Sequence, residues 1–295
     1  MALRRSPRAI SISLVILLAA AALSSCGAAT ASARTRTHTS RTAPSGGTTA
    51  PPSTSSTTSS SPSTTSSTTS TTTTPGPTTT VVSAPGGHVT VLEVGDSLGI
   101  DLGWGLDWAL ASDPSVQVVA DAKGDSGLVN TAFYNWPAVL QSELQTVHPQ
   151  IVIVFLGAND HQSFYANGVY DGFGSPSWVS QYTSRVDAMM NEATAAGAEV
   201  LWVGMPIMQS PSLNDAVKEV DAIYESQAAT HPHVTYLSSW NLFTTPSGQF
   251  NAGTALVDGS PMTLRTPDGV HLASGGADLL ALAVVKEMRQ LYGLP

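Results

Sequence analysis

The sequence predicts an α/β protein, a three-layer α/β/α sandwich with a flavodoxin-like, mainly parallel sheet of five strands. Two observations favour this fold class. Short runs rich in Val and Ile recur along residues 88–295, and segments long enough to form helices separate them. The apolar runs are continuous rather than alternating, which is typical of strands that helices cover on both faces.

The expected strands and helices alternate along the chain. The strands are Val89–Val94, Val116–Ala120, Ile151–Leu156, Val200–Gly204 and Val234–Leu237. The helices are Leu98–Ala111, Pro137–Thr146, Pro176–Ala196, Leu213–Ala229 and Ser274–Leu291. In the third helix, residues spaced three or four apart share one apolar face: Trp178, Tyr182, Val186, Met189 and Ala193. Trp104 and Trp108, one helical turn apart, are expected in the core.

Residues 1–26 have the pattern of a bacterial export signal. Three arginines precede an apolar run that is short for a membrane span. The following Leu23-Ser24-Ser25-Cys26 resembles a lipobox, the site where a bacterial lipoprotein is cleaved and lipidated. Cys26 is the only cysteine, so it has no disulfide partner within the chain. We expect lipidation of Cys26 and a membrane anchor on the extracytoplasmic face; the alternative is a plain secretory signal and a secreted protein.

Residues 27–87 consist largely of Ser, Thr and Pro, which cannot bury enough apolar surface to offset the entropy lost on ordering. This segment is therefore expected to be a disordered linker, and residues 88–295 to form the folded domain. All 21 acidic residues but only six of the 12 basic ones lie in that domain, leaving it a formal charge of −15. Such a domain repels phosphate backbones, so nucleic acid is excluded as an expected partner.

Three short motifs follow expected strands or precede the last helix. Gly95-Asp96-Ser97-Leu98 follows the first strand, Gly157-Ala158-Asn159-Asp160 follows the third, and Asp268-Gly269-Val270-His271 lies near the C-terminus. In the flavodoxin-like strand order 2-1-3-4-5, the first and third strands are neighbours where the order reverses, and sites form beyond such strand ends. The loop after the second strand, Lys123–Gly127, ends at the same edge. The motifs are therefore expected to meet.

The residue types in these motifs are those needed for acyl transfer through a covalent serine intermediate. The Ser97 hydroxyl is a weak nucleophile, and His271 would remove its proton. Asp268 would accept from the imidazole Nδ1 and fix its tautomer. Other interpretations stay open: Ser97 also suits a helix N-cap, Asp268-Gly269 a turn, and Asn159-Asp160 a polar turn after a strand.

The motifs also resemble the blocks of the GDSL hydrolases of the SGNH superfamily, over essentially all of residues 88–295. The segments Trp202–Pro206 and Leu264-Arg265 resemble a bacterial envelope lipoprotein branch. The resemblance implies the SGNH hydrolase fold, with Ser97 as nucleophile, Asp268 and His271 completing the triad, and an oxyanion hole. Its donors would be the backbone N–H groups of Ser97 and Gly127 and the side-chain amide of Asn159. Gly124 is the alternative to Gly127.

We expect an extracytoplasmic serine ester hydrolase, of the GDSL type, that acts on O-acyl and in particular O-acetyl esters of an envelope carbohydrate. No cofactor is expected, because the sequence has neither a spaced metal-ligand cluster nor a glycine-rich phosphate loop. A monomer is expected. The rival functions are an O-acyltransferase with the same triad and a non-catalytic envelope-binding lipoprotein that keeps the fold.

Four further expectations concern residues near the motifs. Asp96 and Asp160 are expected to stabilise loops as hydrogen-bond acceptors. The aromatic residues of His161–Trp178 have two possible roles, stacking on sugar rings or packing the loop itself. His161 is a candidate for lining the pocket. Arg265 would either bind an anionic group of a substrate or pair with a carboxylate.

Overall fold

The structure is a computed structural model that describes residues 87–166, 168–257 and 259–294. The expected export signal, Cys26 and the linker up to residue 86 lie outside this part of the chain and stay predictions. Within the described ranges, none of the helices has both the length and the apolar character needed to cross a bilayer.

A five-stranded, fully parallel sheet with the order β2-β1-β3-β6-β7 forms the centre of the domain. Its strands are β1 (Val89–Gly95), β2 (Val116–Ala122), β3 (Ile151–Phe155), β6 (Glu199–Val203) and β7 (Val234–Leu237). These are the five expected strands in the expected order, with bounds that differ by at most two residues. The prediction of a flavodoxin-like parallel sheet is confirmed.

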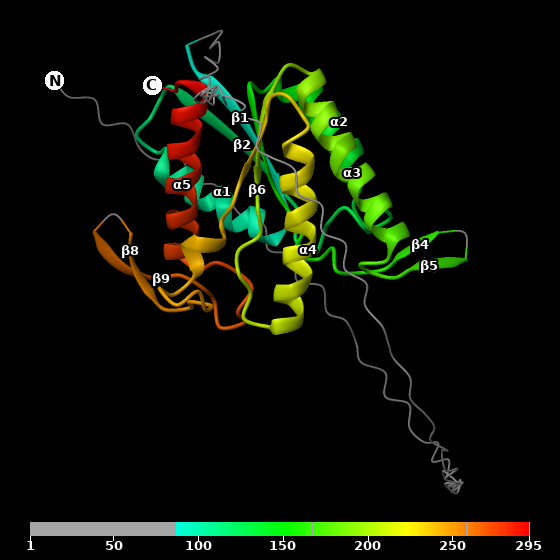
Figure 1. Cartoon of the computed structure of the whole chain (residues 1–295). Helices are drawn as coiled ribbons and strands as arrows, with labels where there is room; N and C mark the ends of the chain where they lie inside the picture. Colours follow the sequence, from blue (N-terminus) through cyan, green and yellow to red (C-terminus); the bar gives the residue numbers. More distant parts are fainter. Residues whose placement is uncertain (1–86, 167, 258, 295) are drawn as a thin grey trace, which may run out of the picture. The chain divides into compact units, whose positions relative to one another are not determined.

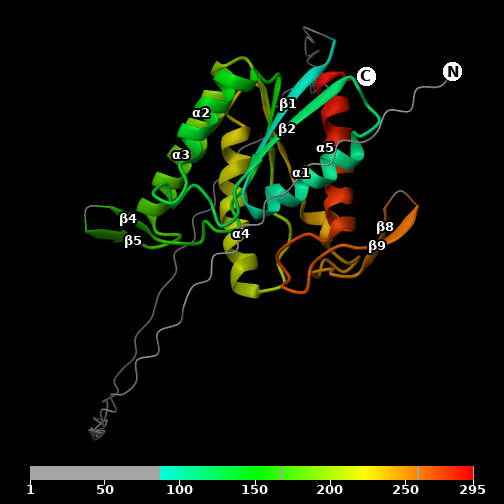
Figure 2. The same cartoon turned by 180° about the vertical axis from the view of Figure 1, so that it is seen from behind.

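Five helices cover the sheet in two layers (Figures 1 and 2). They are α1 (Ser97–Ala109), α2 (Trp136–Val147), α3 (Pro176–Ala195), α4 (Pro211–Ala228) and α5 (Ser274–Tyr292). Helices α1 and α5 pack together on one face, and α2, α3 and α4 cover the other. Three of them begin with a proline in the first two positions, where its missing N–H costs no helical hydrogen bond.

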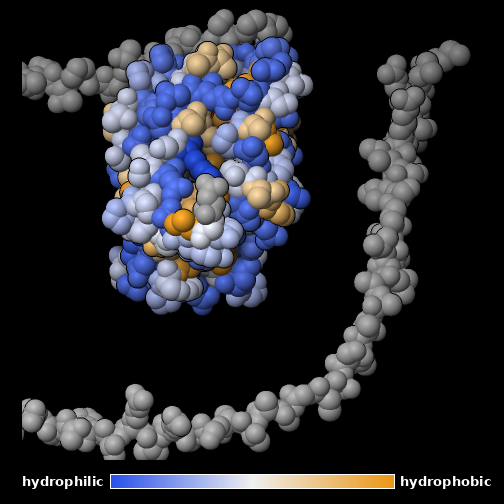
Figure 3. All heavy atoms as spheres, turned by 90° about the vertical axis from the view of Figure 1, so that its right-hand side faces the viewer, coloured by the Kyte–Doolittle hydropathy of each residue, from blue (hydrophilic) through white to orange (hydrophobic). Residues whose placement is uncertain are grey.

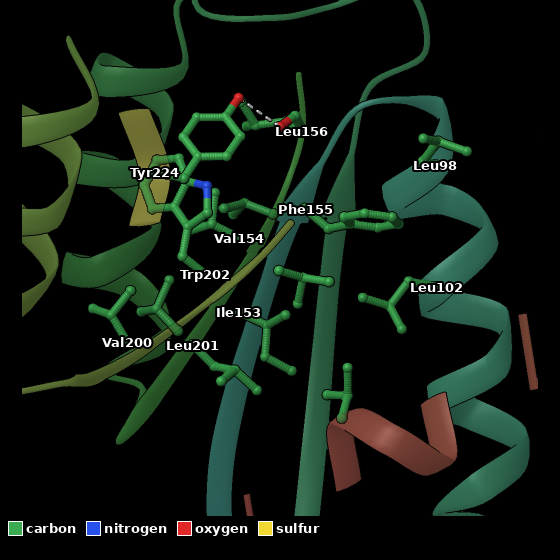
Figure 4. Close-up of a cluster of buried hydrophobic side chains, with 14 of the residues drawn as sticks. Leu98, Leu102, Ile153, Val154, Phe155, Leu156, Val200, Leu201, Trp202 and Tyr224 are labelled. Atoms are coloured by element: carbon green, nitrogen blue, oxygen red, sulfur yellow. Dashed lines mark hydrogen bonds between the residues drawn. The ribbon is translucent and has the colours of Figure 1, made fainter. Parts of the chain in front are cut away.

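The core lies on both faces of the central strand β3, every residue of which is buried. Successive side chains of a strand point to opposite faces. In Figure 4, Phe155 accordingly points toward Leu98 and Leu102 of α1, whereas Val154 lies on the side of Trp202 and Tyr224. The expected apolar face of α3 is buried in full: Trp178, Tyr182, Val186, Met189 and Ala193.

The expectation that Trp104 and Trp108 lie in the core is wrong. Their exposed fractions are 67% and 42%. Helix α1 turns its leucines toward the sheet, and its glycines allow close approach to neighbouring elements. At Gly105, a Cβ atom would overlap the backbone of Ala277 in α5. The two indoles are therefore left on the outer side of a helix that is apolar nearly all round.

Two short antiparallel hairpins were not predicted. They are β4 (Phe164–Ala166) with β5 (Val169–Asp171), and β8 (Thr254–Val257) with β9 (Ser260–Thr263). A 3-10 helix, η1 (Trp240–Phe243), is likewise new. In Figure 1 the hairpins extend from opposite sides of the lower end of the molecule, where the strands of the sheet finish. They thus flank the edge at which the motifs were expected to meet.

Candidate active site

Ser97 lies at the end of β1, where the chain turns sharply into α1. Gly95 makes this turn possible, since a Cβ atom there would overlap the carbonyl oxygen of Phe155. The N-cap of α1 is Asp96, whose Oδ1 accepts from the backbone N–H of Leu98 at 2.9 Å. Ser97 is the first residue inside the helix, so the interpretation of its hydroxyl as the cap is wrong.

The structure brings Ser97, His271 and Asp268 into one line. His271 Nε2 lies 2.9 Å from Ser97 Oγ, and His271 Nδ1 lies 2.7 Å from Asp268 Oδ2. A carboxylate oxygen only accepts, so Nδ1 carries a proton and donates it to Asp268. In the neutral ring Nε2 then has a free lone pair facing the serine hydroxyl. This is the arrangement in which an imidazole can take a proton from serine.

The Asp268 carboxylate is held by its own turn. Oδ1 accepts from the backbone N–H groups of Val270 and His271 at 2.8 and 3.0 Å, and from the Thr266 hydroxyl at 2.6 Å. Burial raises the pKa of Asp268, but the hydrogen bonds from His271, Thr266 and the two amides outweigh it and hold the pKa well below its usual range. Asp268 is therefore ionised at neutral pH and stabilises the imidazolium that would form.

Asp96 ties the serine turn to the loop after β3. Its Oδ2 accepts from the backbone N–H groups of Gly157 and Ala158 at 2.9 and 3.1 Å. Burial raises the pKa of Asp96 to about 6, although the hydrogen bonds from Gly157 and Leu98 act in the opposite direction. The expected loop-stabilising role of this side chain is what the structure shows.

Asp160 does the same for the loop after β2. Its two oxygens accept from the backbone N–H groups of Leu128 and Val129 at 3.0 and 2.8 Å. The Tyr182 hydroxyl donates to Oδ2 at 2.8 Å. Burial raises the pKa of Asp160, and the hydrogen bonds from Leu128, Val129 and Tyr182 lower it. Loops from three parts of the sequence are thus fixed to one another by two buried carboxylates.

The candidate oxyanion donors lie on these tied loops. Asn159 Nδ2 donates to the carbonyl oxygen of Ser126 at 2.9 Å, which uses one of the two N–H groups of the amide. Gly127 is the residue after Ser126, and its Cα lies so close to Asp160 that an added Cβ atom would overlap Asp160 Oδ1. At Gly124 a Cβ atom would meet nothing nearer than Ile100 at 4.0 Å. Packing thus requires glycine at Gly127 and not at Gly124.

Ser97 contributes a third candidate donor through its backbone. As the first residue of α1 it has an N–H group that the helix itself does not pair. The N-terminal end of the helix also favours negative charge nearby. The site therefore has a helix terminus, a buried glycine and an amide at the strand ends, which are the kinds of donor that stabilise an oxyanion.

Asp101 is a residue at the site that the sequence analysis missed. It lies on α1 one turn after Ser97, is 7% exposed, and its Oδ2 accepts from the backbone N–H of Leu272 at 2.9 Å. Leu272 directly follows His271, so this bond attaches the histidine segment to the helix that carries the serine. An aspartate four residues after Ser97, between Ile100 and Leu102 of an apolar helix, was the available signal.

Arg265 has neither of its two expected roles. It is 2% exposed and donates to the backbone oxygens of Ile207 and Val270 at 2.8 and 2.6 Å. Its guanidinium group lies over the rings of Phe243 and Phe250, 5.3 and 5.1 Å from their centroids. The side chain therefore supports the turn that carries Asp268 and His271, and is too buried to meet a substrate anion.

The aromatic residues of 161–178 differ in exposure, and some of them have the expected role of packing the loop itself. Trp178 and Phe164 are buried, and Phe173 packs edge-on against Trp178 at 4.6 Å between ring centroids. Tyr165 and Tyr170, on β4 and β5, are exposed and lie 4.4 Å apart. Figure 3 looks onto the side from which this hairpin extends, where apolar residues form separate spots on a mostly hydrophilic face. The two tyrosines and the partly buried Phe173 are therefore accessible to a ligand.

Within the described ranges, no group of three or more His, Cys, Asp or Glu residues is arranged to hold a metal ion.

Several solved structures are similar to this chain at low sequence identity. An α/β hydrolase from the metagenome of Lake Arreo, Spain, superposes with a TM-score of 0.51 and 12% identity, covering 72% of this chain and 99% of that one. An acetylxylan esterase from Geobacillus stearothermophilus, solved as a catalytic mutant, has a TM-score of 0.49 and 13% sequence identity, covering 69% of this chain and 95% of that one. The catalytic domain of peptidoglycan O-acetyltransferase A from Streptococcus pneumoniae has a TM-score of 0.46 and 17% sequence identity, covering 71% of this chain and 98% of that one.

A comparison with curated proteins gives no match. The strand order and the layers are those of the SGNH hydrolase fold that the motifs implied. A family described as "Protein of unknown function (DUF459)" matches residues 90–287, well over half of the chain. The protein is therefore a member of the DUF459 family.

Proposed function

We propose that the protein is a serine esterase that hydrolyses O-acyl esters through an acyl-enzyme at Ser97. The observation that carries the proposal is the continuous line from Ser97 Oγ through His271 to Asp268, with separations of 2.9 and 2.7 Å. A non-catalytic binding protein has no need for such an alignment, so this rival is disfavoured.

In the first half of the reaction, Ser97 Oγ attacks the ester carbonyl carbon and its proton passes to His271 Nε2. The resulting oxyanion would accept from the Ser97 and Gly127 backbone N–H groups and from Asn159 Nδ2. The C–O bond to the alcohol then breaks, and the alcohol leaves with the proton from His271. Asp268 stabilises the positive charge that the imidazole carries between these steps.

In the second half, a water molecule attacks the acyl-serine and gives a proton to His271. The bond to Ser97 Oγ breaks, the serine recovers the proton, and the carboxylic acid is released. The side chains of His271 and Asp268 are 39% and 49% exposed, so solvent reaches the base. Ready access of water favours hydrolysis over the rival reaction, in which an O-acyltransferase passes the acyl group to a sugar hydroxyl.

The finer proposal is an enzyme for O-acetyl esters on envelope carbohydrate, held at the extracytoplasmic face of the membrane by lipidated Cys26. The export-signal pattern and the Ser/Thr/Pro-rich segment before residue 88 support the location. The exposed pair of tyrosines beside the site supports a carbohydrate substrate. Mass spectrometry of Cys26 after membrane extraction tests the anchor; a soluble protein that begins elsewhere would reject it in favour of secretion.

The esterase itself is tested with a fluorophosphonate probe and p-nitrophenyl acetate. Wild-type protein and Ser142→Ala, which changes an exposed serine on α2, are expected to be labelled and to release nitrophenol. Ser97→Ala is expected to lose both. A well-folded wild-type protein without labelling at Ser97 would reject the proposal, and product analysis with and without a sugar acceptor separates hydrolase from acyltransferase.

A further inference from the structure

A cavity of about 450 Å³ lies between the loop after β3 and the start of α4, and its lining includes His161, two residues after Asn159. This volume is within the range of small-molecule sites, roughly 300–1,000 Å³. The residues of its lining on which the argument depends are His161, Phe173, Ser210, Ser212, Asp215 and Glu219.

The walls of the cavity continue into the loops of the active site. On one side, His161 Nδ1 lies 3.1 Å from the carbonyl oxygen of Ala158, beside Asn159. On the other, Ser210 follows Gln209, whose backbone N–H donates to the carbonyl oxygen of Gly269 at 3.1 Å, in the turn between Asp268 and His271. The cavity is therefore bounded by segments that are attached to the loops of Asn159 and of Asp268–His271.

The polar groups of the cavity are mainly acceptors. Asp215 and Glu219 supply carboxylates, and among the described residues none that lines the cavity is Lys or Arg. Because the Ala158 carbonyl can only accept, His161 Nδ1 carries a proton, and in the neutral ring Nε2 is a further acceptor. Such a lining disfavours anions and fits a ligand rich in hydroxyl or ammonium donors.

Phe173 adds one apolar surface to this acceptor-rich lining. It is partly buried and is held edge-on by Trp178. A sugar ring has an apolar face that packs on such a ring and hydroxyl groups at its rim that donate to carboxylates. A quaternary ammonium group has no N–H and could not donate a hydrogen bond to His161 Nε2, Asp215 or Glu219.

We infer that this cavity is the sugar-binding site of the enzyme, where a neutral or amino sugar stacks on Phe173 and donates to Glu219, Asp215 and His161. The inference rests on the proposed esterase function and adds to it the place and charge preference of the carbohydrate. A second cavity of about 340 Å³ shares Glu219 and continues between α3 and α4, with Val179 and Ile223 in its lining. The site therefore has room for more than one sugar unit.

Binding is tested directly on Ser97→Ala protein, which retains the cavity but does not turn over. NMR titrations would compare cellotetraose, which is neutral, a chitosan tetramer, which is cationic, and tetragalacturonate, which is anionic. The first two are expected to shift the resonances of the cavity residues. They are also expected to bind at least about tenfold more tightly than the third, because the free energy of one hydrogen bond to a charged group corresponds to about a tenfold change in affinity.

Variants connect the binding to Glu219. Glu219→Gln is expected to lower the affinity for the chitosan tetramer roughly tenfold or more. Glu225→Gln is the same change farther along α4 and outside this cavity, and it is expected to leave that affinity unchanged. With O-acetylated cello-oligosaccharide as substrate, kcat/KM of Glu219→Gln should fall about tenfold more than with p-nitrophenyl acetate. Thermal melts confirm that each variant is folded.

Three outcomes would overturn the inference: tetragalacturonate binding as tightly as cellotetraose, no binding of either neutral or cationic sugar, or acetylcholine being hydrolysed in preference to acetylated sugar in a Glu219-dependent manner. In each case labelling of Ser97 by fluorophosphonate would show that the esterase proposal itself still holds. Loss of that labelling in folded wild-type protein rejects the esterase instead, so the two failures are distinguishable.

Discussion

Two kinds of buried carboxylate lie on β1 and on the loops that carry the candidate site, and they differ in what surrounds them. Asp96 and Asp160 each accept three hydrogen bonds and join loops that come from distant parts of the chain. Glu93, on β1 just before the serine turn, is 0% exposed, and neither of its carboxyl oxygens has a partner among the described residues. It faces Gly99 and Gly103 of α1.

The difference shows what a buried acidic group needs in order to act at a site. Amide and hydroxyl donors replace the lost hydration of Asp96 and Asp160, so each carboxylate can hold a loop in place. At Glu93 burial raises the pKa well above its usual value, and the neighbouring charges of Asp96 and Asp121 raise it further. Glu93 is therefore expected to be neutral in the folded protein and to fix no loop.

The largest effect is expected when Asp160, one of the two hydrogen-bonded carboxylates, is removed. Asp160→Ala leaves the Leu128 and Val129 amides buried without an acceptor, and leaves the Tyr182 hydroxyl with the Tyr224 hydroxyl as its partner. Because each such group costs about 1–3 kcal/mol, we expect the free energy of unfolding to fall by about 3–5 kcal/mol, measured by urea denaturation. Asp160→Asn keeps one acceptor oxygen and should lose less. A loss below about 1 kcal/mol for the alanine variant would contradict the role assigned to this carboxylate.

Glu93→Gln is expected to act in the opposite direction. The folded pKa of Glu93 lies above the unfolded value of 4.5, so stability is intact below that pH and is lost as the pH rises through the folded pKa. Glutamine does not ionise, so the variant should be more stable than wild type at pH 8, and this gain should disappear near pH 4.

The control for this prediction is Glu225→Gln, which removes an exposed charge from α4 and should change the free energy of unfolding little at either pH. Urea denaturation at the two pH values provides the measurement. If Glu93→Gln stabilises the protein equally at both pH values, an ionisation-independent packing effect is responsible and the assignment of a neutral Glu93 is wrong.

Asp101 lies between these two kinds, with one backbone partner, and a smaller effect is expected. Asp101→Ala releases the segment of His271 from α1, and a loosened His271–Ser97 contact should lower kcat for p-nitrophenyl acetate by roughly tenfold with little change in KM. Asp101→Asn retains an acceptor oxygen for Leu272 and is expected to restore most of kcat. Equal losses in both variants would show that the hydrogen bond is not what positions the histidine.

The motif residues could be predicted from sequence because they depend on topology. Continuous Val-rich runs fix a parallel sheet, and a parallel sheet brings the residues after its first and third strands together, which is where Ser97 and Asn159 lie. Asp268 and His271 are only three residues apart, so a local turn is enough to bring them into contact. These inferences need no knowledge of side-chain packing.

Other features depend on contacts between elements and left little trace in the sequence. The roles of Asp101 and Arg265 arise from backbone groups 171 and 58 residues away, which no local pattern encodes. The strands of β4–β5 and β8–β9 span three or four residues, too few for a period to appear. Trp104 and Trp108 were misplaced because α1 is apolar on several sides, so that composition alone did not tell which side faces the sheet.

The smallest effect is expected at Gly124, and it sharpens the role of Asp160. A Cβ atom at Gly124 would make only an ordinary van der Waals contact with Ile100 at 4.0 Å, so Gly124→Ala should change the free energy of unfolding by no more than about 0.5 kcal/mol and leave esterase activity unchanged. The matched change Gly127→Ala drives a methyl group into the Asp160 carboxylate and should shift the loop that carries a proposed oxyanion donor. Its kcat for p-nitrophenyl acetate is expected to fall by about 10²-fold. If Gly124→Ala lowered kcat more than Gly127→Ala, the proposed oxyanion donor would be the backbone N–H of Gly124 instead. The Asp160 carboxylate would then not be what holds the loop of Gly127 in place.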